Sequence, residues 1–234
     1  MGKLICDNFD TYTVGARPAT GPWVANPDCT VPSAYQIGVS NVQSFSQPKS
    51  LFSQTPTDNT PCELNGDLGT NIPSDLYVRV KVRFAKATFP KTDSTQFDHN
   101  NISFASLSSA TGSDAGIRFS VMGSNLCPAA GFAIHYADQD IRGCTSVVPA
   151  ADQWYCIEAH VQSTATAVTT TLSIDGIVQA EYDPQTMKAS TTYTHLGAMS
   201  LRYLNVGIRS YSTAYTTALY EDDVAVSTAP IGCE

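Results

Sequence analysis

The stretch Leu76–Phe84 (LYVRVKVRF) decides the fold class, because apolar and polar residues alternate along most of its length. Successive side chains of a β-strand point to opposite faces of the sheet, so this pattern predicts a half-buried strand. Two rows of side chains result: an apolar row of Val78, Val80, Val82 and Phe84, and a polar row of Tyr77, Arg79, Lys81 and Arg83.

Shorter runs of the same kind follow at 101–107, 116–122, 131–137, 154–161, 167–174, 178–182, 200–211 and 218–226. The pair Asp175 and Gly176 lies between two of these runs and predicts a tight hairpin, since both residue types tolerate a positive φ. Residues 154–161 (WYCIEAHV) also fit a helical spacing, but we favour a strand because another strand and the hairpin follow directly. The pattern predicts an all-β, two-sheet antiparallel sandwich that forms a single domain over residues 1–234.

The first 70 residues differ from the rest, because prolines are scattered through them: Pro18, Pro22, Pro27, Pro32, Pro48, Pro56 and Pro61. Each proline removes a donor from the hydrogen-bond ladder of a sheet. We therefore expect loops and short edge strands in this segment, wrapped over the sandwich.

Composition narrows the function. The chain has 234 residues, of which 15% are charged, and a net charge of −8. Nucleic-acid backbones are bound by basic surfaces, so this charge argues against nucleic acid as the main partner. No stretch approaches the roughly 18 apolar residues of a membrane span.

Seven cysteines are many for a protein of a reducing compartment, and they predict an exported protein, secreted or on the cell surface, with disulfides. The best pairs by position are Cys6 with Cys233, if the first and last strands are neighbours, Cys127 with Cys144, and Cys29 with Cys62. Cys156, inside the run 154–161, is the candidate for a buried free thiol.

Several short motifs together resemble the concanavalin A-like jelly roll: DNFD at 7–10, SQPKSLFSQ at 46–54, YVRVKVRF at 77–84, WYCIEAHV at 154–161, LSIDGIVQAEY at 172–182 and YEDDVAV at 220–226. That superfamily includes laminin G-like domains, carbohydrate-binding modules, laminarinase-type glycosidases and polysaccharide lyases. The resemblance implies a jelly roll in which the concave sheet forms a groove for a polysaccharide.

Arg79, Lys81 and Arg83 must lie outside the core, either in that groove or on the convex surface. In the groove they would bind the carboxylates or sulfates of an anionic glycan, which suit the planar fork of arginine. On the convex surface they would be ordinary solvated charges. Both interpretations stay open.

A second candidate surface comes from residues 200–211 (SLRYLNVGIRSY) and from His135. Leu204, Val206 and Ile208 share one face, while the opposite face carries Tyr203, Asn205, Arg209 and Tyr211. Aromatic rings beside amides and a guanidinium are suited to binding sugars. His135 points outward from GFAIHYA, whose Phe132, Ile134 and Tyr136 point inward.

The acid pair of the glycosidases, in the pattern E-x-D-x-x-E, is absent from the sequence, which argues against glycoside hydrolysis. AIH at 133–135 and YLNVGIRSY at 203–211 are similar to Q-I-H and Y-F-K-A-G-V-Y-N-Q of alginate lyases. By that resemblance His135 takes the place of a neutralising histidine. However, Arg209 replaces the catalytic tyrosine, Ala133 replaces the glutamine, and the R-S/T-E-L-R motif is missing.

The resemblance also implies a structural calcium ion between the first and last strands, held by Asp7, Asp10, Asp222 and Asp223 through carboxylate oxygens. Three functions remain open. The chain binds a polysaccharide in a groove, or it is a polysaccharide lyase that uses His135, Tyr203 and Arg79. In the third, it is a surface or adhesion protein whose groove is filled by the proline-rich loops.

Overall fold

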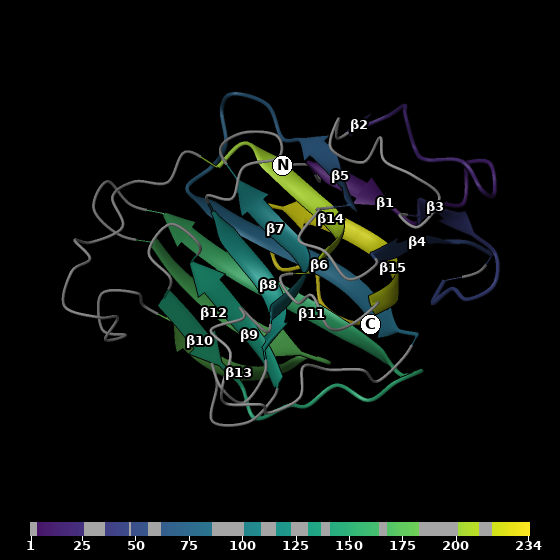
Figure 1. Cartoon of the computed structure of the whole chain (residues 1–234). Helices are drawn as coiled ribbons and strands as arrows, with labels where there is room; N and C mark the ends of the chain where they lie inside the picture. Colours follow the sequence, from purple (N-terminus) through teal and green to yellow (C-terminus); the bar gives the residue numbers. More distant parts are fainter. Residues whose placement is uncertain are drawn as a thin grey trace.

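Strands make up the regular structure of this protein, and no helix occurs among the residues described here. The computed structural model describes residues 4–25, 36–46, 48–55, 62–85, 101–108, 116–122, 131–136, 141–163, 168–182, 201–210 and 217–234. Their strands form two antiparallel sheets, which confirms the predicted all-β sandwich (Figure 1).

The first sheet, called the β6 sheet below, has the order β13-β12-β11-β6-β15-β4-β3, and β1 pairs with β15. Its strands are β13 (Ile177–Tyr182), β12 (Val168–Ile174), β11 (Trp154–Ser163), β6 (Asp75–Phe84), β15 (Thr217–Ser227), β4 (Ser50–Thr55), β3 (Gln36–Ser40) and β1 (Ile5–Asp7).

The second sheet, called the β14 sheet, has the order β10-β9-β8-β7-β14-β5-β2. Its strands are β10 (Ile141–Cys144), β9 (Gly131–Tyr136), β8 (Ile117–Met122), β7 (Asn101–Ser108), β14 (Tyr203–Ser210), β5 (Cys62–Asp67) and β2 (Trp23–Ala25).

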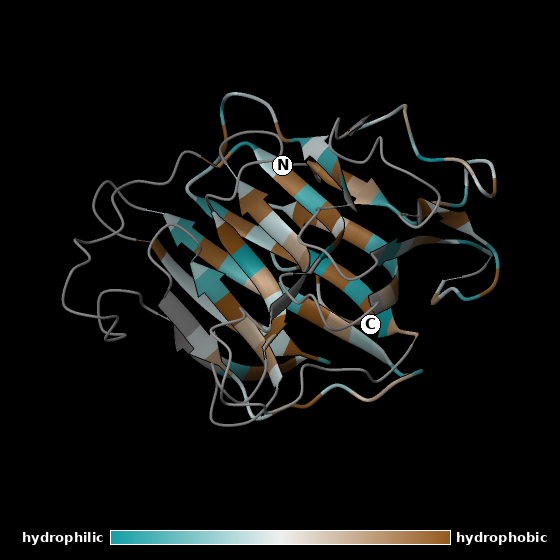
Figure 2. Ribbon diagram, viewed as in Figure 1, coloured by the Kyte–Doolittle hydropathy of each residue, from teal (hydrophilic) through white to brown (hydrophobic). Residues whose placement is uncertain are grey.

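The core lies between the apolar faces of the two sheets. The inward row of β6 is confirmed, since Val78, Val80, Val82 and Phe84 are each at most 2% exposed. The Phe84 ring contacts Phe104 of β7, with centroids 6.2 Å apart, and Phe132 of β9, at 6.3 Å. Each such buried ring contributes about 1.5–3 kcal/mol. Figure 2 shows the alternation as hydrophobic and hydrophilic bands along the strands.

Two local predictions are confirmed. Residues 154–163 form strand β11, and β12 and β13 are joined by the predicted hairpin turn. Asp175 has φ 50° and Gly176 has φ 78°, so both residues adopt the positive φ that the predicted tight turn requires.

The expectation for the N-terminal segment is only partly right. β2 and β3 are edge strands, but β4 lies between β15 and β3, and β5 lies between β14 and β2. Neither β4 nor β5 contains a proline, so the prolines flank these interior strands and leave their ladder donors intact.

The predicted pair of Cys6 and Cys233 is wrong, and so is the free thiol at Cys156, because Cys156 is bonded to Cys233. β1 and β15 are neighbours as expected, with Cys6 opposite Ala225. After β15, however, the C-terminal residues lie against β11, and Cys233 is therefore beside Cys156. Cys144 is also disulfide-bonded. Cys29, Cys127 and the side chain of Cys62 lie outside the described part of the chain.

Candidate functional site

A line of polar side chains crosses the outer face of the β14 sheet. The backbone register joins five residues on adjacent strands, which we call the polar row: Asn65 of β5, Asn205 of β14, Ser106 of β7, Arg118 of β8 and His135 of β9. Flanking residues such as Leu64 and Ile134 face the core, so the row faces away from it. Five strands at about 4.8 Å spacing give the row a length of about 19 Å.

The amides of the polar row are incompletely hydrogen-bonded. Asn205 Nδ2 donates to Ser106 Oγ and to Ser108 Oγ, each at 3.0 Å. Asn205 Oδ1 and both polar atoms of the Asn65 amide are buried without a hydrogen-bond partner. Such a buried group costs about 1–3 kcal/mol. Asn65 and Asn205 are 0% and 1% exposed, and native proteins leave few such buried groups unpaired.

Arg209 lies on the same face but is held in an ion pair. Its Nη2 atom donates to Glu63 Oε2 at 3.0 Å, and both side chains are almost completely buried. The register of β14 shifts between Val206 and Arg209, where Gly207 has φ 110°. Glycine adopts this conformation without strain. The bulge thus sets the position of Arg209 relative to the polar row.

Glu221 of β15 lies in the core behind β14. It shares the inward face with Leu219, it is fully buried, and neither of its carboxyl oxygens has a hydrogen-bond partner. Burial raises its pKa well above the ordinary value, and repulsion from Glu63 raises it further. The nearby Gly207 amide lowers this pKa, although it does not meet the geometry of a hydrogen bond.

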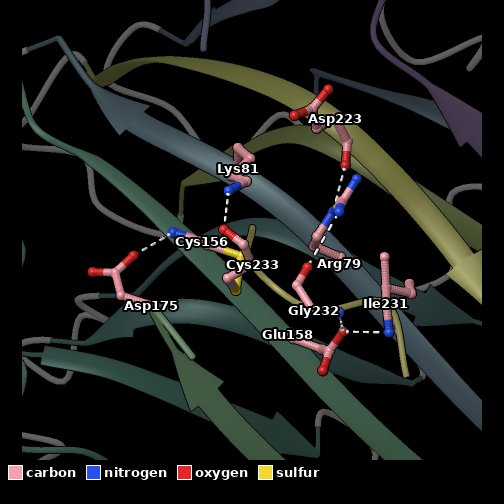
Figure 3. Close-up of a disulfide and its surroundings, with 9 residues drawn as sticks. All are labelled: Arg79, Lys81, Cys156, Glu158, Asp175, Asp223, Ile231, Gly232 and Cys233. Atoms are coloured by element: carbon pink, nitrogen blue, oxygen red, sulfur yellow. Dashed lines mark hydrogen bonds between the residues drawn. A yellow bond between two sulfur atoms is a disulfide. The ribbon is translucent and has the colours of Figure 1, made fainter. Parts of the chain in front are cut away.

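Two basic side chains of β6, Arg79 and Lys81, lie on the other sheet, under the C-terminal residues 231–233, which we call the C-terminal strap (Figure 3). Arg79 Nη1 donates to the Gly232 carbonyl at 3.2 Å, and Lys81 Nζ donates to the Cys233 carbonyl at 2.9 Å. Arg83 forms an ion pair with Asp152 at 3.0 Å. These charges are thus partly engaged by the protein itself.

Arg79, Lys81 and Arg83 therefore do not share a groove with His135, and the predicted lyase set of His135, Tyr203 and Arg79 is not brought together. Alternation along a strand shows which side chains avoid the core, but it does not show on which sheet the strand lies. Tyr203 lies on the face of His135, opposite Ser108, with the Arg202 guanidinium 5.0 Å from its ring centroid. Tyr211 lies outside the described residues.

The four predicted calcium ligands have separate partners. Asp7 accepts hydrogen bonds from Tyr12 and Trp23, and Asp10 accepts one from the Lys49 amide. Two further acids meet at one residue: the Ser46 amide donates to Asp222, and the Ser46 hydroxyl donates to Asp223.

In the described part of the chain no three His, Cys, Asp or Glu side chains are grouped to hold a metal ion, so these acids do not fit a shared calcium site. The ion stays a prediction, which calorimetric titration with calcium would test.

Sequence reasoning missed Arg118, Ser106 and Asn65. Arg118 was within reach, because Ile117, Phe119 and Val121 of β8 alternate with Arg118 and Ser120. Asn65 gave no such signal, because β5 (CELNGD) has one large apolar residue and follows a proline-rich segment.

The comparisons with known proteins concern the fold. No protein-family model and no curated protein matches this chain. Among solved structures, the cellulose induced protein Cip1 matches with a TM-score of 0.65 and 15% identity, over 98% of this chain and 100% of the other. At this identity the likeness shows a shared fold, the two-sheet antiparallel sandwich described above.

Two lyase structures share this fold. An endo-β-1,4-glucuronan lyase from the fungus Trichoderma reesei matches with a TM-score of 0.61 and 11% identity, over 97% of this chain and 96% of the other. A variant of the alginate lyase Aly36B, in complex with an alginate tetrasaccharide, matches with a TM-score of 0.54 and 12% identity, over 98% of both chains. At such identities the likeness establishes the fold, and function must be argued from the site.

Proposed function

We propose that the protein binds an acidic polysaccharide along the polar row of the β14 sheet. The observation that carries the proposal is the alignment of a guanidinium, an imidazole, a hydroxyl and two amides on one line across five strands. These groups hydrogen-bond to hydroxyls and carboxylates, and arginine matches a carboxylate with two parallel donors. The uronate polymers named for the two similar lyases have this chemistry.

Isothermal titration with glucuronan and alginate oligosaccharides tests this function. We expect Arg118→Ala to weaken binding by about tenfold or more, since a hydrogen bond to a charged group contributes about 1.5–3 kcal/mol. Arg83→Ala removes a guanidinium from the opposite sheet and should bind like the wild type. Circular dichroism confirms that both variants fold. Absence of binding to any acidic polysaccharide, or equal binding by Arg118→Ala, would overturn the proposal.

A second candidate, a polysaccharide lyase, is favoured by one observation: Arg118 and His135 are opposite each other in the ladder, and Tyr203 lies on the same face. In β-elimination a base removes the proton at C5 of a uronate, the bond from C4 to the leaving oxygen breaks, and a C4–C5 double bond forms. Arg118 would neutralise the carboxylate and His135 would accept the proton. Tyr203 would donate a proton to the leaving oxygen.

Ultraviolet absorbance distinguishes the two candidates, because only elimination creates the unsaturated uronate. A lyase gives rising absorbance with a glucuronan or alginate substrate, and His135→Ala abolishes it. A binding protein is retained by the same polymers, and their absorbance stays constant. A surface protein without a glycan site gives neither result.

Secretion or display on the cell surface remains part of this proposal. The disulfide between Cys156 and Cys233 supports export, because such bonds form in oxidising compartments. Within the described ranges, no helix is long and apolar enough to cross a membrane.

A further inference from the structure

The outer face of the β6 sheet carries a line of three aromatic side chains and one arginine that the proposed function does not use. The register joins four residues on adjacent strands, which we call the aromatic line: Trp154 of β11, Arg83 of β6, Tyr220 of β15 and Phe52 of β4. All four are half-buried. At about 4.8 Å between strands, the line is about 14 Å long.

Contacts within the aromatic line hold its rings in place. The Phe52 and Tyr220 rings have centroids 5.0 Å apart, and Phe45 packs edge-on against Trp154 at 6.0 Å. Arg83 lies between the rings of Trp154 and Tyr220 in the register, and Asp152 offsets its charge at 3.0 Å. The line therefore presents apolar surface with a balanced ion pair.

The line ends at an open pocket of about 530 Å³ beside Phe52. Gly38 of β3 lies opposite Phe52. A Cβ atom on Gly38 would come within 3.2 Å of the Gly15 carbonyl oxygen. The backbone of the loop around Gly15 thus forms one wall. Asn41 and Val42 also line the pocket, and Val42 is 68% exposed. Polar and apolar groups both face the space.

We propose that the aromatic line and this pocket form a second glycan site, which takes a neutral polysaccharide of extended β-linked pyranoses. Aromatic rings pack against the apolar faces of pyranoses, and Asn41 can hydrogen-bond to hydroxyls. A neutral polymer fits the balanced charge of Arg83 and Asp152, and a net charge of −8 does not repel it. The site is separated from the polar row by the core.

A purely structural role for these rings is the alternative, because aromatic pairs on adjacent strands stabilise a sheet. The same outer face supplies a control for that role. Tyr77 of β6 stacks on His160 of β11 with ring centroids 4.1 Å apart, and neither residue belongs to the aromatic line or the pocket. Tyr77→Ala removes a ring from the same sheet without altering the proposed site.

Titration calorimetry with cellohexaose and depletion from microcrystalline cellulose test the second site. We expect the wild type to bind both, and Trp154→Ala and Tyr220→Ala each to weaken binding by about tenfold, the loss expected for one stacked ring. Tyr77→Ala and Arg118→Ala should bind like the wild type. Absence of binding to the neutral glucan would overturn the proposal. So would unchanged binding by both line variants, or equal weakening in Tyr77→Ala.

Discussion

Three consecutive acids of β15 show how strongly the surroundings of a single residue set its chemistry. Glu221 points into the core, Asp222 is buried under the Phe45 and Ser46 amides, and Asp223 accepts a hydrogen bond from the Ser46 hydroxyl. The strand can place them so differently because its register shifts between Asp222 and Ala225, where Asp223 has φ 47°. From the sequence, Asp222 and Asp223 were expected to hold one calcium ion with Asp7 and Asp10, and Glu221 carried no prediction.

Glu221→Gln should make the protein less sensitive to alkaline pH. The pKa of Glu221 is raised by burial, so its contribution to stability is complete below its unfolded pKa of 4.5 and is lost as pH rises through the folded value. Glutamine has a similar shape and cannot ionise. Urea unfolding at pH values from about 5 to about 9 measures the difference, with Glu234→Gln as the exposed control. An equal loss of stability in Glu221→Gln and the wild type would contradict this assignment.

Asp222 should contribute a pH dependence in a lower window. Burial raises the pKa of Asp222 to about 7, although the amides of Asp223, Phe45 and Ser46 oppose the shift. Its contribution is complete below the unfolded value of 3.8 and is lost as pH rises through about 7. We therefore expect the urea midpoint of unfolding to vary less with pH in Asp222→Asn than in the wild type across this window. A curve for Asp222→Asn that parallels the wild type would argue against the raised pKa.

At the scale of the element, alternation in the sequence predicted the strands well. In β14 it identified every core residue that the structure shows, and in β6 every one except Leu76, because period two is a local property of the chain. It did not predict that β6 and β14 belong to different sheets, since pairing depends on contacts far apart in the sequence. For the same reason it missed β5, which owes its place to β14 and β2 rather than to its own residues.

The C-terminal strap is a short element fixed by several contacts. Glu158 Oε2 accepts hydrogen bonds from the amides of Ile231, at 2.9 Å, and Gly232, at 2.7 Å, and Cys233 is bonded to Cys156 (Figure 3). Burial beneath the strap lowers the pKa of Lys81, which donates to the Cys233 carbonyl. The disulfide closes a loop with a sequence separation of 77 residues.

Removal of this disulfide should be costly. We expect the double variant Cys156→Ser, Cys233→Ser to lose about 2–5 kcal/mol of unfolding free energy, because cross-linking a long loop restricts the unfolded chain. Urea unfolding without reductant measures this loss, and Cys6→Ser, at an exposed position, is the control. If the double variant were as stable as Cys6→Ser, the strap would contribute little to stability.

At the scale of the whole molecule, basic side chains lie on both outer faces of the sandwich. Composition argued only against nucleic acid, whereas the structure separates basic side chains between the polar row, with Arg118 and His135, and the β6 sheet, with Arg79, Lys81 and Arg83. The candidate site was thus predicted in part: His135 and Asn205 belong to the row, while the basic strand belongs to the opposite face. This assignment of side chains to opposite faces depends on how the strands pair in three dimensions, which the sequence pattern does not show.

Salt should affect the association of an acidic polysaccharide in a characteristic way. A protein with a net charge of −8 repels a polyanion at long range, and salt screens that repulsion, with a Debye length of about 8 Å at physiological ionic strength. We expect the association rate for alginate to rise as salt is added, and the dissociation rate to rise because the contacts of Arg118 weaken. Surface plasmon resonance measures both rates. An association rate that falls steadily with salt would indicate attraction by the net field instead.

The strap also determines how the molecule can be attached to other things. Glu234 is exposed directly after Cys233, which is bonded to the outer face of the β6 sheet, so a tag or anchor joined there leaves from the side opposite the polar row. A sensor surface coupled through this end would present the polar row to the solution and crowd the aromatic line. Coupling at the C-terminus therefore allows binding at the polar row to be measured while access to the aromatic line is restricted.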